Sequence, residues 1–263
     1  MGLSMDGDFV AAAAPVMSAM AGLKKPELHD VEGRRKFSSG MVPIKPTAKG
    51  VGVEKYTISA SDGHQLLIYH YKRGDTMDQA SPAPAIVLLK AADFRLDSSS
   101  ISVMGESAGR NLAAAVALLA RDRGLAPPLV KQILIYPILD DRNSLKGIRP
   151  TAYLGHELGR SRVLMFAAPA RAESVKGLPP LYLDVEQLDL FMLKDLEYAI
   201  RFVNAGIETE LHVYPGLLHG FDALVPSYPT SKMAMENRFR AIRKLNRDSY
   251  VNSVSISTRF ENL

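Results

Sequence analysis

An apolar strand, a glycine-bounded turn and a buried helix follow one another without a break over residues 101–124, "ISVMGESAGRNLAAAVALLARDRG". Ile101–Met104 is short and apolar. The residues after Ser107 are rich in alanine and leucine, which would place apolar side chains on nearly every side of a helix. Where a strand runs directly into a helix, the two backbones approach closely, and Gly105 and Gly109 are the small residues that such a turn requires. The segment predicts a strained turn that carries Ser107 at the end of a strand.

The rest of the chain alternates between apolar strands and helices. Strand patterns occupy Ala85–Leu89, "QILIYPILD", Leu181–Val185 and Glu210–Tyr214, and helical patterns occupy Leu193–Ala205 and Pro229–Asn246. This alternation predicts the α/β class with a largely parallel sheet. At 263 residues and 47% hydrophobic composition, the chain suits one large core, so we expect a single domain over residues 1–263.

The N-terminal part of the chain has a different pattern. Residues 8–35 predict one or two short amphipathic helices, with Asp8 as N-cap and a polar, basic exit at Glu32–Lys36, and residues 37–52 predict a loop. A β-hairpin with its turn at Asp62-Gly63 is expected next. The side chains expected on one face of this hairpin are Tyr56, Ile58, Leu66, Ile68 and His70.

Composition excludes several kinds of protein. The chain has no cysteine, which leaves no disulfide framework and no thiolate metal site. The stretch "FVAAAAPVMSAMAG" is interrupted by Pro15 and preceded by Asp6 and Asp8, unlike a signal peptide. No apolar run reaches the roughly 18 residues that cross a membrane. These features favour a cytoplasmic protein.

Basic residues gather near the C-terminus, although the net charge is only +4. Their helical spacing predicts the solvated face of a last helix rather than a surface for nucleic acid or membrane, because no interleaved aromatic residues or binding motif accompany them. The cluster consists of Arg238, Arg240, Arg243, Lys244 and Arg247.

A serine at the end of a strand can act as a nucleophile if a histidine takes its proton and an acid orients that histidine. Three histidines follow Ser107, and the chain order Ser, acid, His is usual for this kind of turn. His219 is favoured as the base because it follows the strand Glu210–Tyr214 in a glycine-flanked loop. His212 lies within that strand, and His156 lies in a region without an assignment.

The acid is expected at the exit of the strand Leu181–Val185. Asp189 is the first choice and Glu186 the runner-up on spacing alone, while Asp184 lies within the strand and suits a structural role. The helix that follows the turn directs its free N–H groups toward the site, so the N–H of Ala108 is the expected oxyanion donor.

The chain resembles the hormone-sensitive-lipase-like branch of the α/β-hydrolase superfamily over most of its length. The matching stretches are "SDGHQLLIYHY", "PAPAIVLL", "ISVMGESAGRNLAAAVALLARDRG", "ILIYPILDDR", "AAPARAESVKGLPPLYLDVEQLDLF" and "AGIETELHVYPGLLHGFD". The resemblance implies an α/β-hydrolase fold, an esterase acting mostly on short acyl chains, and neither cofactor nor metal. It also implies Ser107 as nucleophile, Asp189 in "LDLF" as acid and His219 in "HGF" as base, with residues 1–36 as cap helices.

The sequence departs from that family after the strand "AIVLL". The family carries H-G-G-G there, and two of its glycine N–H groups complete the oxyanion hole, but this chain has Lys90-Ala91-Ala92. Only eleven residues, Lys90–Ser100, separate two strands expected to lie parallel, whereas a parallel crossover needs about a dozen or more. We therefore expect a chain that lacks one interior strand and has a reduced cap or insert at residues 141–177.

Arg110 is a second departure, because the family usually has glycine beside that position. A cation in the first turn of a helix is disfavoured by the helix dipole. One interpretation is that Arg110 lines the pocket and binds an acidic group.

These observations predict a serine carboxylester hydrolase whose turnover is reduced by an incomplete oxyanion hole. An inactive relative that binds a small ligand is the alternative, and an acyl-transfer or elimination enzyme of specialised metabolism is a third interpretation. The expected partner is a small-molecule ester, with no nucleic acid and no transmembrane segment. The oligomeric state stays open.

Overall fold

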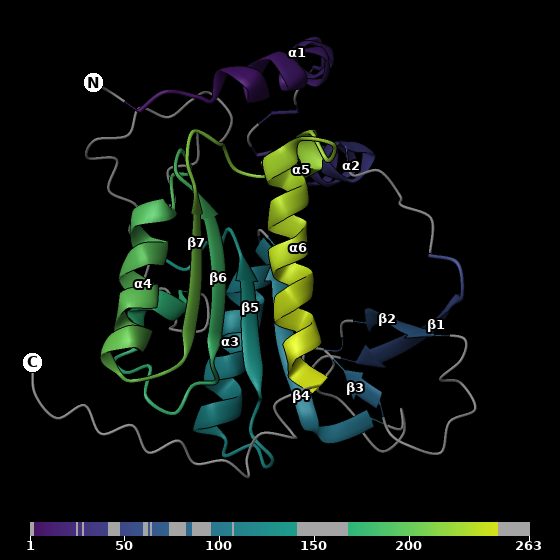
Figure 1. Cartoon of the computed structure of the whole chain (residues 1–263). Coiled ribbons are helices and arrows are strands. Elements are labelled where there is room, and N and C mark those ends of the chain that lie inside the picture. The colour runs from purple at the N-terminus through teal and green to yellow at the C-terminus, as the bar shows by residue number, and fades with distance from the viewer. Residues whose placement is uncertain are drawn as a thin grey trace, which may run out of the picture. The chain divides into compact units, whose positions relative to one another are not determined.

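A computed structural model of the chain (Figure 1) describes residues 3–24, 26–27, 29–41, 48–59, 63, 65–73, 83–85, 96–106, 108–140 and 168–246. The chain divides into two compact units, one made of Met1–Met17 with Pro84–Leu263 and the other of Ser18–Ala83. Among the described helices, none has the length and apolar character needed to cross a membrane.

The elements are, in chain order, α1 (Gly7–Ala21), α2 (Val31–Met41), β1 (Val51–Ser59), β2 (Gln65–Arg73), β3 (Ala83–Ala85), β4 (Leu96–Glu106), α3 (Ala108–Asp122), β5 (Lys131–Ile135), the 3₁₀ turn η2 (Pro169–Arg171), β6 (Leu181–Glu186), α4 (Met192–Asn204), β7 (Thr209–Tyr214), α5 (Phe221–Leu224), α6 (Pro229–Arg243) and the 3₁₀ turn η3 (Lys244–Asn246). The predicted alternation of strands and helices after residue 85 is therefore present.

A five-stranded sheet in the order β3-β4-β5-β6-β7 forms the centre of the larger unit. The strands from β4 to β7 are parallel, and Glu106 pairs with Ile135, which pairs in turn with Asp184. Because parallel strands end at the same edge, the segments that leave β4, β5, β6 and β7 gather at one edge of the sheet. The predicted α/β class with a parallel sheet is confirmed.

Helices cover both faces of this sheet (Figure 1). Leu134 of β5 packs in a core with residues of α3 and α4, whereas its neighbours Ile133 and Ile135 pack with residues of α6. All five residues of β5 are buried, which explains why its last three residues, Ile133–Ile135, are all apolar rather than alternating. α3 and α4 therefore lie on one face and α6 on the other.

The first helix is capped by Asp6 and not by Asp8 as predicted. Oδ1 of Asp6 accepts bonds from the backbone N–H groups of Asp8 and Phe9, both at 3.0 Å. These are two of the donors that a helix start leaves unpaired, so Asp6 is the N-cap, two residues before the predicted one. The fully buried ring of Phe9 then meets the rings of Phe221 and Tyr228 edge-on, at centroid distances of 6.4 and 5.4 Å.

The second helix extends beyond its predicted end. α2 continues through the polar segment expected to be an exit, where the exposed side chains of Glu32 and Lys36 pair at 2.9 Å. It ends at Met41, so residues 37–41 are helical and not part of a loop. The helix stops two residues before Pro43, consistent with the restriction that proline places on the residue before it.

The β-hairpin of the smaller unit is confirmed. β1 and β2 pair antiparallel, and the register places Tyr56 opposite Ile68 and Glu54 opposite His70. Gly63 in the turn has φ +83°, a conformation that glycine adopts without a steric penalty.

β4 is longer than predicted. It starts at Leu96 instead of Ile101, so residues 96–100 of the supposed crossover are strand. Two alternate serines of β4, Ser100 and Ser102, are buried at 6% and 0% exposure. Residues 86–95, which hold most of the predicted strand Ala85–Leu89, lie outside the described residues.

Candidate active site

The turn predicted to carry the nucleophile lies at the edge of the sheet where the parallel strands end. β4 ends at Glu106 and α3 begins at Ala108, one residue on either side of Ser107. Ser107 itself lies outside the described residues. A Cβ atom at Gly105 would lie only 2.3 Å from the carbonyl oxygen of Gly109, so strand and helix are in backbone contact across the turn. Among the described atoms nothing lies within 4 Å of a Cβ at Gly109.

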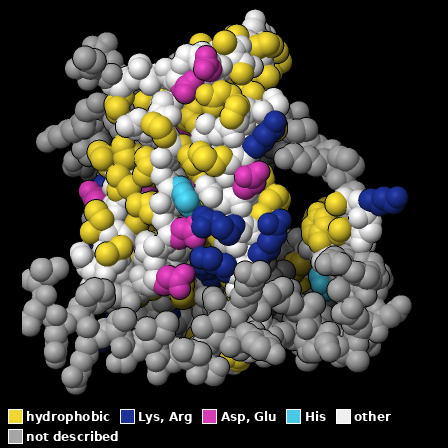
Figure 2. Space-filling model, viewed as in Figure 1, with side chains coloured by type: hydrophobic (Ala, Val, Ile, Leu, Met, Phe, Trp, Pro, Cys, Tyr) yellow, Lys and Arg dark blue, Asp and Glu magenta, His cyan; other side chains and the backbone are white. Residues whose placement is uncertain are grey.

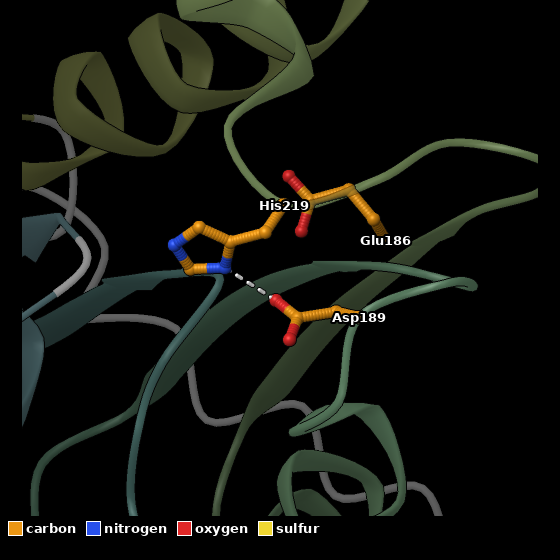
Figure 3. A group of neighbouring side chains, drawn as sticks. All are labelled: Glu186, Asp189 and His219. Atoms are coloured by element: carbon orange, nitrogen blue, oxygen red, sulfur yellow. Dashed lines mark hydrogen bonds and ion pairs between the residues drawn. The ribbon is translucent and has the colours of Figure 1, made fainter. Parts of the chain in front are cut away.

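His219 and Asp189 are brought together at the same edge. His219 lies after β7 and Asp189 after β6, and the histidine Nδ1 is 2.6 Å from Oδ2 of Asp189 (Figure 3). An ionised carboxylate only accepts hydrogen bonds, so Nδ1 carries the proton and Nε2 is left as an acceptor. Figure 3 shows Nε2 on the side of the ring that faces away from both neighbouring carboxylates. A base with its second nitrogen held by an acid is the arrangement that proton transfer from a serine requires.

Backbone hydrogen bonds hold the two loops that carry this pair. The second oxygen of Asp189 accepts a bond from the N–H of Phe191 at 2.9 Å, so both carboxylate oxygens are engaged. The N–H of Leu188 donates to the carbonyl of Leu217 at 3.0 Å, which ties the β6 loop to the β7 loop. The acid is 2% exposed, whereas the histidine keeps partial access to solvent.

Glu186, the alternative acid, lies beside the pair without binding the imidazole. Its Oε1 accepts a bond from the N–H of Gly220 at 3.3 Å, next to the histidine in the chain. Burial raises the pKa of Glu186 well above its ordinary value, and the nearby carboxylate of Asp189 raises that pKa further. Glu186 therefore anchors the histidine loop, and Asp189 is the carboxylate that bonds to His219.

The same three side chains are also close enough to be considered as cation ligands. Glu186, Asp189 and His219 each offer one ligand atom, and these atoms lie within 4.8 Å of one another. Nδ1 of the histidine is already bonded to Asp189, and Glu186 is bonded to a backbone N–H. Oε2 of Glu186 is buried and has no hydrogen-bond partner among the described residues.

Arg110 is fully buried and does not project into solvent. Its guanidinium carbon lies 4.1 Å from the centre of the Tyr136 ring. Burial lowers the pKa of Arg110 to about 10, although the carboxylates of Asp195 and Glu186 favour its charged form. Asp195 of the protein itself therefore supplies a negative charge that stabilises the Arg110 cation.

Tyr136 is a site residue that the sequence did not reveal. It follows β5 directly, its hydroxyl donates to Glu106, and its ring centre is 4.8 Å from that of His219. Its position immediately after an apolar strand, in "ILIYP", is the signal that could have pointed to it, because residues in that position reach the functional edge of the sheet.

The other two histidines that follow Ser107 are His212 and His156. His212 lies on β7 and its Nε2 is 2.9 Å from Oε1 of Glu210, as expected for a residue with a structural or surface role. His156 lies outside the described residues, as does most of the segment 141–177.

The prediction that the C-terminal basic cluster is solvated is wrong for Arg238. Arg238 is 2% exposed, and it donates to Asp184 at 2.6 and 3.2 Å and also to Asp222. Burial disfavours this cation, but the two carboxylates outweigh burial and raise the pKa of Arg238. Asp184 has the structural role that was expected of it. Arg247 lies outside the described residues.

The outer surface around α6 carries charges of both signs. Figure 2 shows Lys and Arg side chains interspersed with Asp and Glu side chains over α6 and its surroundings. Arg240, for example, pairs with Glu210 of β7. The charge of the described part of the basic cluster is therefore partly neutralised.

The chain is similar to an α/β-hydrolase family model and to proteins named as esterases. The family described as alpha/beta hydrolase fold matches residues 75–223, more than half of the chain. Esterase LipI of Mycobacterium tuberculosis is 31% identical over 163 residues, covering 56% of this chain and 50% of LipI, so the chain spans only half the length of that relative. Carboxylesterase NlhH of the same species is 28% identical over 224 residues, covering 78% of this chain and 69% of NlhH.

A solved structure has the same fold over nearly the whole chain. The bacterial heroin esterase superposes with a TM-score of 0.77 at 24% identity, covering 92% of this chain and 98% of that protein. Similarity at this level of identity establishes the fold, and it leaves the reaction to be argued from the site.

Proposed function

We propose a function that starts from family membership, because the chain belongs to the α/β-hydrolase fold family, in its hormone-sensitive-lipase-like branch. In this proposal the protein is a serine carboxylester hydrolase. The observation that carries the proposal is the 2.6 Å contact between His219 and Asp189, located at the sheet edge where β4 turns into α3. The names of the related esterases agree with it.

The proposed reaction passes through an acyl-enzyme. The hydroxyl oxygen of Ser107 attacks the ester carbonyl carbon while Nε2 of His219 takes the hydroxyl proton. The N–H of Ala108, at the start of α3, stabilises the negative charge on the carbonyl oxygen. The alcohol leaves with the proton held by the imidazole, and a water molecule then releases the acid by the same steps in reverse order. Asp189 keeps the imidazole oriented and stabilises its positive charge.

Short-chain acyl esters are the proposed substrates, on the basis of the resemblance alone. In this proposal residues 1–36 and a shortened segment 141–177 form a reduced cap. We further propose that the chain lacks one interior strand and the H-G-G-G donors, since Lys90-Ala91-Ala92 stand in their place. Loss of one oxyanion donor typically lowers turnover by about 10²–10³.

The test combines hydrolysis with labelling of the nucleophile. Purified protein is assayed with nitrophenyl acetate and nitrophenyl butyrate and treated with a fluorophosphonate probe, with Ser107→Ala as the control. We expect slow hydrolysis and stoichiometric labelling that both disappear in Ser107→Ala. Absence of both activities in protein shown to be folded by circular dichroism would refute the proposal.

A binding protein without turnover is the second candidate, favoured by the absence of the H-G-G-G sequence. It predicts saturable binding of a short-chain ester to the folded protein, measured by calorimetry, with no product formed over hours. Labelling by the fluorophosphonate would argue against this candidate, because labelling requires an activated serine.

A further inference from the structure

Tyr136 has a backbone conformation that an aromatic residue rarely adopts. Its φ is +42°, and it is the one non-glycine residue with positive φ in the described part of the chain. Its N–H donates to the carbonyl of Asp184 at 2.6 Å, which fixes this backbone against β6. A bulky residue keeps such a conformation only where its surroundings hold it, and such positions concentrate at functional sites.

The side chain of Tyr136 links two parts of the proposed machinery. Its hydroxyl donates to Oε1 of Glu106, the residue that precedes Ser107. Its ring meets the imidazole of His219 at 66°, an edge-on contact with centroids 4.8 Å apart. One buried side chain, 1% exposed, therefore touches both the strand end before the nucleophile and the base.

Two buried cations hold the ring in place. The guanidinium carbons of Arg110 and Arg238 lie 4.1 and 5.4 Å from its centre, within the range of cation–π attraction. Arg110 comes from α3, the helix that follows the turn, and Arg238 is fixed by its carboxylate partners. These two contacts restrict rotation of the Tyr136 ring. Residues of two helices, α3 and α6, therefore fix its contact with His219.

We propose that Tyr136 is a positioning residue that couples the turn around Ser107 to His219. This inference rests on the proposed function. The hydroxyl holds the strand end through Glu106, and the ring keeps the imidazole in the plane that its bond to Asp189 requires. Tyr136 does not exchange protons in the reaction.

Two substitutions separate the two contacts. Tyr136→Phe removes only the hydroxyl and should lower kcat about tenfold, the effect of one hydrogen bond to a charged group, with KM changed less than about twofold. Tyr136→Leu also removes the ring and should lower kcat about 100-fold. An effect on KM with kcat unchanged would overturn the inference.

Tyr182→Phe is the matched control. Tyr182 is a fully buried tyrosine on the neighbouring strand, and its hydroxyl donates to Asp184 at 3.1 Å without contacting Glu106 or His219. A purely structural loss of a buried hydroxyl should affect both variants alike. We expect Tyr182→Phe to keep the wild-type kcat, so equal losses of kcat in the two Phe variants would refute a positioning role.

A spectroscopic measurement tests the inference independently of turnover. The proton shared by Nδ1 of His219 and Asp189 gives a low-field resonance in proton NMR. Tyr136→Phe and Tyr136→Leu should displace or broaden this resonance, and Tyr182→Phe should leave it unchanged. If the wild-type protein hydrolyses no ester, the proposed function fails while this measurement still decides the positioning role, and an unchanged resonance in every variant would overturn it.

Discussion

Two groups of buried charge occupy opposite faces of the same sheet, and their hydrogen bonding differs. On the α6 face, Arg238 donates twice to Asp184 and once to Asp222. On the face of α3 and α4, Arg110 and Asp195 are both fully buried, but neither carboxylate oxygen of Asp195 has a hydrogen-bond partner among the described residues. In the first group each carboxylate bonds to the arginine, although Oδ1 of Asp222 has no partner among the described residues, whereas in the second group neither oxygen of Asp195 has one.

This difference in hydrogen bonding suggests that the first group stabilises the fold and that the second belongs to the functional site. A buried ion pair with good geometry holds its elements together, and removing one partner is costly. A buried carboxylate without hydrogen bonds destabilises the fold, and such groups gather at functional sites. After burial, the charge that most raises the pKa of Asp195 is that of Asp189, so the unmatched group adjoins the proposed acid. We therefore expect substitutions on the α6 face to change stability and substitutions near Asp189 to change activity.

The largest effect is expected for Asp189→Asn. The amide keeps the shape of the acid but no longer holds the imidazole in the required tautomer, so kcat should fall about 10⁴-fold. Thermal unfolding should change little, in contrast to substitutions on the α6 face. A loss of kcat below tenfold would remove Asp189 from the proposed role and break the comparison.

Arg238→Met should produce the largest loss of stability. It leaves the carboxylates of Asp184 and Asp222 buried without their cation, which should lower the free energy of unfolding by about 3–5 kcal/mol. Urea denaturation gives this value. Because Arg238 also contacts the ring of Tyr136, kcat per folded molecule should fall, but by less than about tenfold, since Arg110 still contacts that ring. If stability changes by less than about 1 kcal/mol, the α6 cluster does not secure the fold.

Asp195→Asn should increase stability at alkaline pH. Burial raises the pKa of Asp195, so the folded protein keeps a proton that the unfolded chain releases between the two pKa values. The stability due to this proton is present at low pH and lost as pH rises through that range. The variant should gain stability relative to the wild type near about pH 8, and gain less near about pH 5. Denaturant melts at both pH values test this, and equal effects at the two pH values would contradict it.

Arg240→Ala should have the smallest effect on stability, and it is the matched control for Arg238→Met. Arg240 lies on the same helix and pairs with Glu210, but its side chain is 50% exposed. Exposed pairs contribute little, so we expect a loss below about 1 kcal/mol that disappears in high salt. A loss as large as that of Arg238→Met would mean that burial does not explain the difference between the two arginines.

Local patterns in the sequence were sufficient to predict the parallel sheet and the order of the candidate site residues along the chain. The apolar runs of β5 and β6 end where polar residues begin, so the parallel edge and the candidates Asp189 and His219 could be located from the chain alone. The hairpin turn at Gly63 was equally local. These features depend on residues that are near neighbours in sequence.

Burial of charge was not predictable in the same way. Arg238 looks like one of several exposed arginines on a helix, and only its distant partner, 54 residues away in Asp184, makes it a core residue. The burial of Arg110 and Tyr136 likewise depends on the packing of α3, β5 and α6 against one another. Periodicity indicates which side of a helix is basic, but it does not indicate which basic side chain meets a carboxylate inside.

The two glycines of the turn have unequal freedom to change during evolution. At Gly105 a single added carbon would collide with the backbone of Gly109 and Arg110, at 2.3 and 2.6 Å, and backbone cannot move aside as a flexible side chain can. Every missense change of a glycine codon adds that carbon. Lineages of this protein that retain the fold should therefore show no drift at Gly105, while Gly109, where the described atoms leave open space, is the one of the pair that can accept alanine.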